Sequence, residues 1–348
     1  MMAKYDLFFP DGTRVLTLPN WQNPRLYLPA RYFLQRWKDS SFYPAFRLLA
    51  RLNRLSLRIR ATVGLGEVRQ VRSSGWPLGE FTHDVLPQAT SVVVLVGTPG
   101  PAQKLTAQLR DDNGRVLGYL KYGEKEAARK RLQQERRMLS CIPEGTGPEL
   151  LKYGTLGDGE ALLTTLLPGK PLPATLPPAR DLTNFLTGLA VLPPVPITNH
   201  PWVRRARNRS QLELDPWFEA LTGRDWPATI QHGDFAPWNL LRRSDGRLGA
   251  IDWEYGTLEG FPYLDLAYYV LQTSALIYHE APLRAAEYAS KYLARQPQLM
   301  LSSVEARALV SLAAYDAYQG FREDGHLPTT NHLQMWRRAI WEGSACCG

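Results

Sequence analysis

Cysteine is scarce in this sequence: only three of its 348 residues are cysteines, and two of the three are adjacent. Cys141, Cys346 and Cys347 therefore exclude a framework of disulfide bonds. Long apolar runs are also missing, since none approaches the roughly 20 residues that cross a bilayer. Asp6 and Pro10 interrupt the amino-terminal segment before the apolar core of a signal peptide could form. We therefore expect a protein of the reducing cytoplasm.

Acidic residues are outnumbered, because 33 Asp and Glu stand against 41 Lys and Arg, a formal net charge of +8. Most of the basic residues are arginines, whose planar fork suits phosphates and carboxylates. The surplus is compatible with an anionic substrate, an acidic membrane surface or nucleic acid, and equally with an arginine-rich composition of no functional meaning. No recognisable nucleic-acid motif accompanies the charge, so no nucleic-acid partner is expected.

The first 75 residues match no motif and are expected to form an amino-terminal extension. A hairpin or loop region opens it, and the stretch from about residue 30 to residue 60 is more helical. Two neighbouring stripes recur there at helical spacing: Arg47, Arg51, Arg54 and Arg58, and beside them Leu48, Leu52, Leu55 and Ile59. This basic amphipathic helix over 47–59 favours packing of its leucines on the parent domain, and peripheral contact with an anionic membrane, at its inner face, is the alternative.

The rest of the sequence divides into a strand-rich segment, 76–167, and a helix-rich segment, 168–348. The first contains a charged helix and five expected strands: the strands 91–97, 104–111 and 115–123, the helix 124–139, and two strands within 147–167. The second opens with a proline-rich linker and is helical apart from a strand and hairpin between Thr229 and Trp253. This order predicts an α+β fold, in which a small antiparallel sheet lobe with one helix precedes a mostly helical lobe.

The segment QHGDFAPWNLLRRSDGRLGAIDWEYG, residues 231–256, carries the chemistry. Asp234 is followed five residues later by Asn239, and Asp252 comes thirteen residues after that. A turn at 244–247 separates two short apolar strands, so the hairpin is expected to bring Asp252 back beside Asn239. Phosphoryl transfer needs such a set: one carboxylate receives the attacking hydroxyl, while an amide and a second carboxylate hold Mg²⁺ against the phosphates.

This segment resembles the signature of aminoglycoside phosphotransferases and choline kinases, which share a protein-kinase-like fold. Their H-G-D-x-x-x-x-N matches residues 232–239, and their I-D-[WF]-E matches residues 251–254. By that resemblance Asp234 is the catalytic base, and Asn239 and Asp252 are the ligands of Mg²⁺. The resemblance also implies that 76–167 is a nucleotide-binding lobe and that 168–348 is a catalytic and acceptor-binding lobe.

The resemblance extends upstream and downstream, from about residue 91 to about residue 275. Lys121 ends the third strand, where family members and protein kinases place the lysine that holds the α- and β-phosphates. Glu135, fourteen residues on, resembles the helix glutamate that pairs with this lysine, and Glu126 is the fallback. Asp265 resembles a later D-x-A element, which supports the catalytic loop from the start of a helix.

Two more stretches resemble parts of a nucleotide site. Thr164, Thr165 and Leu166 resemble the hinge, whose main-chain groups meet adenine. The loop GTPGPAQ contains Gly97 and Gly100, and a tight turn there could bring N–H groups to the phosphates. Its two prolines remove donors, so an ordinary hairpin loop is the alternative. The resemblance implies ATP as the donor, with GTP left open, and Mg²⁺ as the metal.

The acceptor is expected to be a hydroxyl of a small molecule or glycan. The basic stretch 203–209 favours a neutral or anionic acceptor, such as a sugar, phosphosugar or lipid-linked saccharide, unless it is a solvated helix face. HGDFAPWN with DWEY also resembles family members of bacterial cell-surface polysaccharide synthesis. Aromatic residues around the catalytic segment could stack on a sugar, cage a quaternary amine or form core: Trp238, Trp253, Tyr255, Phe261, Tyr263, Tyr268 and Tyr269.

Three other functions compete with this reading. One is a catalytically inactive kinase-fold binding module, which would lack a residue among Lys121, Asp234, Asn239 and Asp252, whereas all four are present. Another is a choline- or aminoglycoside-type kinase for a cationic acceptor. The third is a protein kinase, and the short stretch from Asp252 to Asp265 leaves no room for its activation segment.

Overall fold

The computed structural model describes residues 4–42, 48–209, 215–325 and 331–345. Its contacts group the chain into two compact units, Met1–Arg136 with Pro148–Leu167, and Arg137–Gly147 with Pro168–Gly348. The division at residues 75 and 167 stays a prediction. Arg47, Cys346, Cys347 and the side chain of Leu48 lie outside the described part. Among the helices that the structure describes, none combines the length and the apolar character that a membrane span requires.

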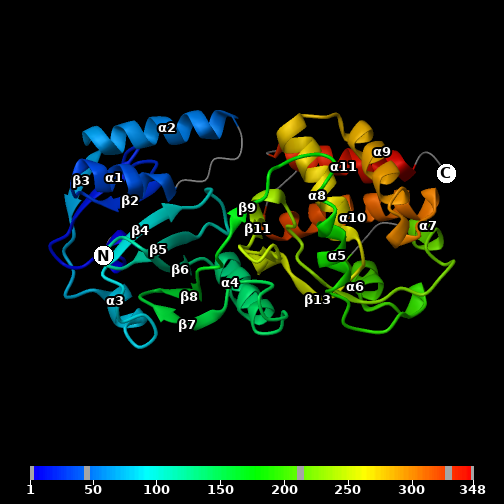
Figure 1. Cartoon of the computed structure of the whole chain (residues 1–348), viewed down its shortest axis with the longest axis horizontal. Coiled ribbons are helices and arrows are strands. Elements are labelled where there is room, and N and C mark those ends of the chain that lie inside the picture. Colours follow the sequence, from blue (N-terminus) through cyan, green and yellow to red (C-terminus); the bar gives the residue numbers. More distant parts are fainter. Residues whose placement is uncertain (1–3, 43–47, 210–214, 326–330, 346–348) are drawn as a thin grey trace. The chain divides into compact units, whose positions relative to one another are not determined.

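One antiparallel sheet forms the centre of the first unit (Figure 1). Its eight strands follow the order β3-β1-β2-β4-β5-β6-β8-β7. Their bounds are β1 (Arg14–Leu18), β2 (Leu26–Pro29), β3 (Glu67–Gln70), β4 (Ser91–Val96), β5 (Leu105–Arg110), β6 (Val116–Gly123), β7 (Leu150–Leu156) and β8 (Gly159–Thr165). The five strands predicted after residue 90 are confirmed. Three strands of the amino-terminal segment extend the same sheet, because β2 pairs with β4.

Strand β4 shows why its sequence is apolar at almost every position. Val92 and Val94 belong to one buried cluster, which also contains Phe8 and Phe9. Val93 points the opposite way, into a second cluster with Leu57. A strand that is covered on both faces needs apolar side chains on both, so its sequence does not alternate.

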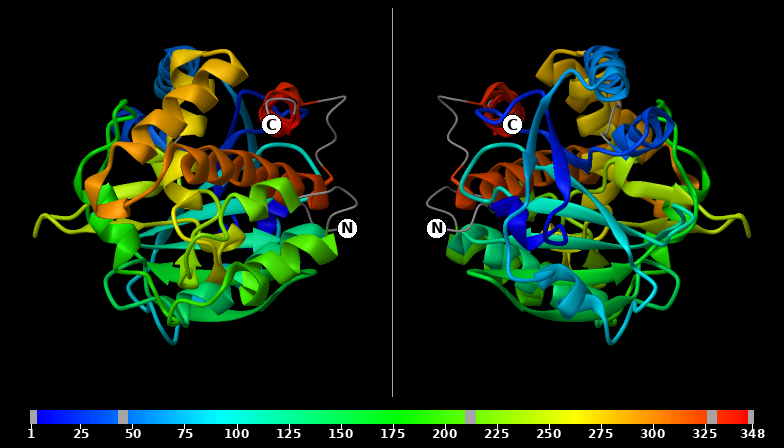
Figure 2. Two further views of the ribbon diagram at one scale, coloured as in Figure 1. Left: turned by 90° about the vertical axis from the view of Figure 1, so that its right-hand side faces the viewer. Right: turned by 90° about the vertical axis from the view of Figure 1, so that its left-hand side faces the viewer.

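Helices of 3 to 16 residues accompany the sheet of this unit. They are η1 (Lys4–Leu7), α1 (Phe33–Asp39), η2 (Ser40–Phe42), α2 (Leu48–Val63), α3 (Pro77–Thr82) and α4 (Glu126–Leu139). The right-hand view of Figure 2 shows α1 and α2 together on one side of the amino-terminal strands, and α2 contacts β1 while α1 contacts β2. Within the described residues, the helical stretch predicted between residues 30 and 60 is thus confirmed, as α1, η2 and α2.

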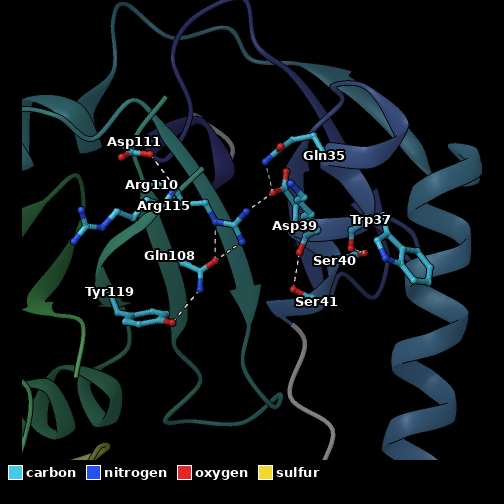
Figure 3. Close-up of polar contacts among 11 residues, drawn as sticks. Gln35, Trp37, Asp39, Ser40, Ser41, Gln108, Arg110, Asp111, Arg115 and Tyr119 are labelled. Carbon is cyan, nitrogen blue, oxygen red and sulfur yellow. Dashed lines mark hydrogen bonds and ion pairs between the residues drawn. The ribbon is translucent and has the colours of Figure 1, made fainter. Parts of the chain in front are cut away.

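A buried ion pair joins α1 to the sheet (Figure 3). Arg110 on β5 contacts Asp39, the last residue of α1, and the two side chains are only 8% and 2% exposed. Gln35 donates to Asp39 at 2.9 Å, and Gln108 accepts from Nε of Arg110 at 2.8 Å. Gln108 also donates to the hydroxyl of Tyr119 at 2.9 Å. Because an unpaired buried charge is costly, α1 and the sheet stabilise each other.

Helices dominate the second unit. They are α5 (Asp181–Thr187), η3 (Ile197–Asn199), α6 (Pro201–Arg209), α7 (Asp215–Glu219), η4 (Pro237–Asn239), η5 (Trp253–Tyr255), α8 (Leu264–Thr273), η6 (Ser274–Tyr278), α9 (Pro282–Ala294), η7 (Pro297–Leu299), α10 (Ser303–Glu323) and α11 (His332–Ala345). Helix α8 is buried over its whole length and contacts α9 and α10. It therefore forms the centre of the helical unit.

Two small sheets complete the second unit. Strand β10 (Thr229–Gln231) pairs with β13 (Thr257–Gly260), and β11 (Leu240–Arg242) pairs with both β9 (Lys170–Pro171) and β12 (Leu248–Ala250). The strand and hairpin predicted between Thr229 and Trp253 are confirmed. These two sheets hold the segment that the sequence marks as catalytic.

Candidate active site

The hairpin of β11 and β12 brings the two ends of the catalytic motif together. Leu240 lies opposite Ala250 in the antiparallel ladder. One residue further on, the N–H of Ile251 donates to the carbonyl oxygen of Asn239 at 2.9 Å. The predicted return of Asp252 to the neighbourhood of Asn239 is therefore confirmed at the level of the main chain.

The H-G-D turn is fixed by its surroundings. Gly233 has a φ of 79°, and a Cβ there would lie 2.4 Å from the carbonyl oxygen of Tyr255, so only glycine fits without strain. The N–H groups of His232 and Gly233 donate to the Asp265 carboxylate at 2.6 and 2.9 Å. The His232 ring contacts the carbonyl oxygen of Ile251 at 2.9 Å. The predicted support of the loop by Asp265, from the start of α8, is confirmed.

Both oxygens of the Asp234 carboxylate are held by hydrogen bonds. Tyr268 donates to Oδ1 at 2.6 Å, and the side-chain amide of Asn239 donates to Oδ2 at 3.0 Å. Loss of water raises the pKa of Asp234 to about 6, and the charge of Asp252 acts in the same direction. The Tyr268 hydrogen bond and the Arg337 charge oppose that rise of the pKa. Asp234 is thus a positioned carboxylate that titrates close to neutral pH.

Two residues of this cluster were not predicted to contact the catalytic carboxylate or its hydrogen-bond partner: Tyr268 and Arg337. Tyr268 lies one helical turn after Asp265 on α8, so that spacing is a signal that could have revealed it. Arg337 lies on α11, is 2% exposed, and its Nη2 is 3.3 Å from the Tyr268 hydroxyl. Burial raises the pKa of Tyr268 well above its ordinary value, so the hydroxyl remains a donor to Asp234. Nothing in the sequence distinguishes Arg337 from the other arginines.

Asn239 and Asp252 offer oxygen ligands. The amide nitrogen of Asn239 donates to the carbonyl oxygen and to Oδ2 of Asp234, which leaves its amide oxygen as the acceptor atom of that group. Asp252 adopts a left-handed conformation, with φ 72° and ψ 54°, which aspartate tolerates better than most residues. Mg²⁺ prefers oxygen ligands and takes few of them from a protein. The residues present therefore fit the predicted ion.

In the first unit Lys121 and Glu135 form the predicted ion pair. The Lys121 ammonium lies 2.5 and 2.7 Å from the two carboxylate oxygens of Glu135. The lysine side chain is 18% exposed and the glutamate side chain 2%. Glu126, the fallback, is 82% exposed and pairs with Lys130 at 2.7 Å. The geometry therefore favours Glu135 as the partner of Lys121.

The three predicted hinge residues differ in their surroundings. Thr164 and Thr165 are the last residues of β8, and Thr165 exchanges two hydrogen bonds of 2.9 Å with the main chain of Glu149. Leu166 follows the strand and is 39% exposed. Its main-chain groups lie beyond the β8 ladder, as a hinge contact with a base requires. The role of all three stays a prediction.

The turn between β4 and β5 is closed by its own hydrogen bonds. The N–H of Gly97 donates to the carbonyl oxygen of Lys104 at 2.9 Å, and its carbonyl oxygen accepts from Gln103 at 3.1 Å. The carbonyl oxygen of Gly100 accepts from Lys125 at 3.0 Å. These contacts favour the ordinary hairpin loop, and contact of Gly97 and Gly100 with phosphates stays a prediction.

The basic stretch 203–209 is matched by acidic side chains. It forms most of α6, in which Arg207 pairs with Asp215 at 2.8 Å and Arg209 pairs with Glu323 at 2.7 Å. These charges are therefore neutralised within the second unit. For these two arginines the pairing favours the alternative, a solvated helix face, over contact with an anionic acceptor.

The aromatic residues around the catalytic segment separate into two groups. Most of them are core residues with exposures of 5% or less: Trp253, Phe261, Tyr268 and Tyr269. The other three are partly exposed: Trp238, Tyr255 and Tyr263. Tyr255 stacks on Phe321 with ring centroids 5.1 Å apart, next to the Gly233 turn. Of the expected aromatic wall, this second group is the one whose side chains are partly open to solvent.

Comparison with known proteins identifies the family. The model of the phosphotransferase enzyme family, APH, matches residues 106–298, more than half of the chain. The chain belongs to this family. The predicted family, and the protein-kinase-like fold that it implies, are thereby confirmed, and the chain is a member of a phosphotransferase family.

Solved structures of kinases resemble the chain at low identity. A Plasmodium vivax ethanolamine kinase is 10% identical over 76% of this chain and 85% of that one, with a TM-score of 0.41. A putative fructosamine-3-kinase from Haemophilus somnus 129PT is 10% identical over 76% and 96%, with a TM-score of 0.42. The bifunctional kinase-methyltransferase WbdD is 15% identical, with a TM-score of 0.29, and this chain spans only 47% of its length. No curated protein matches the chain by sequence.

Proposed function

We propose that the protein transfers the γ-phosphate of ATP to a hydroxyl of a small molecule or glycan, with Asp234 as the base. The observation that carries this proposal is the Asp234 carboxylate, held on both oxygens by Tyr268 and Asn239 and with its pKa raised to about 6. A base of that pKa is ionised at neutral pH and still accepts a proton readily, which suits general-base catalysis.

The mechanism follows from the residues in each unit. Asp234 would receive the proton of the acceptor hydroxyl as its oxygen attacks the γ-phosphorus, while the bond from that phosphorus to the β-phosphate oxygen breaks and ADP leaves. Lys121, paired with and oriented by Glu135, would hold the α- and β-phosphates. Asn239 and Asp252 would hold Mg²⁺, which when bound offsets the charge of the phosphates.

A sugar or lipid-linked saccharide is the acceptor that we favour. The partly exposed Tyr255 offers an aromatic face beside the catalytic turn, and such faces stack on sugar rings. A neutral sugar is favoured over a phosphosugar, because Arg207 and Arg209 are paired with carboxylates. Contact of the 47–59 helix with an anionic membrane would bring the enzyme to a lipid-linked acceptor.

A cationic acceptor is the second candidate. Tyr255 donates its hydroxyl to Asp324, whose side chain is buried, so an aromatic ring and a carboxylate meet near the catalytic turn. That combination is typical of sites that bind amines. A screen of neutral sugars against choline and aminoglycosides separates the two candidates, because each predicts turnover with one set only.

The first test is a thermal-shift titration with ATP, GTP and ADP, each with and without Mg²⁺, on wild type and on Asp252→Ala. Ligand binding to the folded state raises the melting temperature. We expect an Mg²⁺-dependent shift in wild type that the variant loses. A protein that shifts with none of the nucleotides would instead be the inactive binding module.

A further inference from the structure

Helix α2 turns an apolar stripe toward solvent. Its buried side is short, since Leu57 (8% exposed) and Ala61 (0%) face the cluster that contains Leu16 and Leu28. The opposite side carries four aliphatic residues at helical spacing: Leu52 (56% exposed), Leu55 (48%), Ile59 (49%) and Val63 (61%). The preferred expectation, that these leucines pack on the parent domain, is therefore wrong for the stripe. A helix needs only one buried side to dock, and α2 has a second apolar one.

Positive charge borders this stripe. Helix α2 contains four arginines and no acidic residue. At 100° per residue, Arg51 and Arg58 fall on one border of the stripe and Arg60 on the other. Arg60 donates to main-chain carbonyl oxygens, and the Arg58 guanidinium lies 3.8 Å from the centre of the Trp37 ring. In the part of the chain that the structure describes, no ion pair joins the α2 arginines to a carboxylate.

Helix α6 provides a contrast within the same molecule. It is also rich in arginine, but Arg207 and Arg209 are paired with Asp215 and Glu323. Its apolar residues Trp202 and Val203 are buried, at 1% exposure each. Helix α2 thus differs in both respects, because it exposes its apolar side and leaves its cations without acidic partners among the described residues.

We propose that α2 lies on an anionic lipid surface. The stripe would enter the boundary between headgroups and acyl chains, and the bordering arginines would meet the headgroup phosphates. The neighbouring helix α1 adds exposed apolar side chains at its start, Tyr32 (88% exposed), Phe33 (57%) and Leu34 (62%). Charge complementarity favours an anionic bilayer over an apolar protein groove, because every charged residue of α2 is a cation.

Vesicle flotation of the full-length protein tests the proposal. The vesicles are phosphatidylcholine alone, and phosphatidylcholine mixed with phosphatidylglycerol. We expect wild type to float with the anionic vesicles only, and high salt to weaken the binding. The double variant Leu55→Ser/Ile59→Ser should bind at least tenfold more weakly, and each of Arg51→Gln and Arg58→Gln roughly fivefold more weakly.

A matched control removes exposed aliphatic side chains elsewhere. Leu283→Ser/Val304→Ser changes residues of similar exposure, 58% and 51%, on α9 and α10. This variant should float like wild type. The nucleotide-dependent thermal shift should be the same in all these proteins, so loss of binding to vesicles would not reflect loss of folding.

Three results would overturn the proposal. One is wild type that stays unbound with anionic vesicles. Another is a Leu55→Ser/Ile59→Ser variant that binds as well as wild type. The third is a wild-type dimer, seen by light scattering, that does not bind vesicles and that the Leu55→Ser/Ile59→Ser substitutions convert to a monomer. The stripe would then be a contact between two copies of the chain.

Discussion

The charged residues of the candidate site have different surroundings in the two units. In the first unit, Lys121 and Glu135 are in direct contact, so each charge stabilises the other. In the second unit, burial and the like charge of Asp252 raise the pKa of Asp234 to about 6. The pair thus provides a cation in direct contact with its partner, whereas the Asp234 carboxylate can gain and lose a proton near neutral pH. A fixed cation suits the binding of phosphates, and a titrating carboxylate suits proton transfer.

A second ion pair of the first unit sharpens this lesson. Arg110 lies on the same sheet as Lys121 and pairs with Asp39 of α1, yet its side chain is only 8% exposed where that of Lys121 is 18% exposed. Nε and Nη2 of Arg110 donate to the side-chain oxygen of Gln108. A buried ion pair by itself therefore does not mark a functional site, and the greater exposure of Lys121 is one observation that favours it over Arg110 as the residue that binds phosphates.

The largest effect is expected from removal of the titrating group. Asp234→Ala should lower kcat by about 10²–10⁴-fold, because the acceptor hydroxyl loses its base. The nucleotide-dependent thermal shift should remain, since Lys121 is untouched. Asp245→Ala, at the exposed tip of the same hairpin, is the control and should keep full activity. Steady-state kinetics with the identified acceptor would measure both, and equal activity of Asp234→Ala and wild type would remove the base assignment.

The pH profile should separate the two kinds of charge. A base must be ionised to accept a proton, so kcat/KM should fall about tenfold per pH unit below the pKa of Asp234, which is about 6. Nucleotide binding does not require Asp234 to accept a proton, so the dissociation constant of the nucleotide should change little over the same range. A parallel fall of both quantities would contradict the comparison.

The two ion pairs should respond differently to neutralisation. Glu135→Gln should raise the KM for ATP by about tenfold, because Lys121 loses its orienting charge, and should lower the free energy of unfolding by about 1–3 kcal/mol. Arg110→Gln should lower that free energy by about 3–5 kcal/mol and leave the KM unchanged. Urea denaturation and ATP kinetics measure the two effects. A raised KM in Arg110→Gln would show that both pairs serve the nucleotide.

The smallest effect concerns the hydroxyl that holds the base. The Tyr268 hydrogen bond lowers the pKa of Asp234, so Tyr268→Phe should shift the acid limb of kcat/KM to higher pH. Arg337→Gln should act in the same direction, since it removes a nearby positive charge. Arg338→Gln, which changes an exposed arginine paired with Glu342, should not move the limb. A Tyr268→Phe profile identical to that of wild type would show that the contact does not tune the base.

The sequence was sufficient to predict those parts of the site whose residues lie close together in the chain. The hairpin between Asn239 and Asp252 is local, and turn residues with two apolar runs were enough to predict it. The Lys121–Glu135 contact followed from the resemblance to the family, which places a lysine at the end of the third strand and its partner glutamate in the next helix. Arg337 was missed because its contact with Tyr268 spans 69 residues and no local pattern records it.

The amino-terminal segment shows the same limit for the fold. Its hairpin and helices were predicted from local patterns, but their place in the sheet depends on the pairing of β2 with β4, for which the sequence has no periodic signal. The exposure of the α2 stripe was also missed, because apolar spacing identifies a face of a helix and not what covers that face.

The pairing of β2 with β4 has a consequence for shortened versions of the protein. A chain that begins at residue 76 would leave β4 with unsatisfied main-chain groups along an open edge. That edge carries the run SVVVLV, whose β-branched residues and lack of charge favour pairing with other chains. We expect such a protein to aggregate. We therefore expect the amino-terminal strands to protect the sheet of the first unit from such pairing, because β2 occupies the place beside β4 that another chain would take.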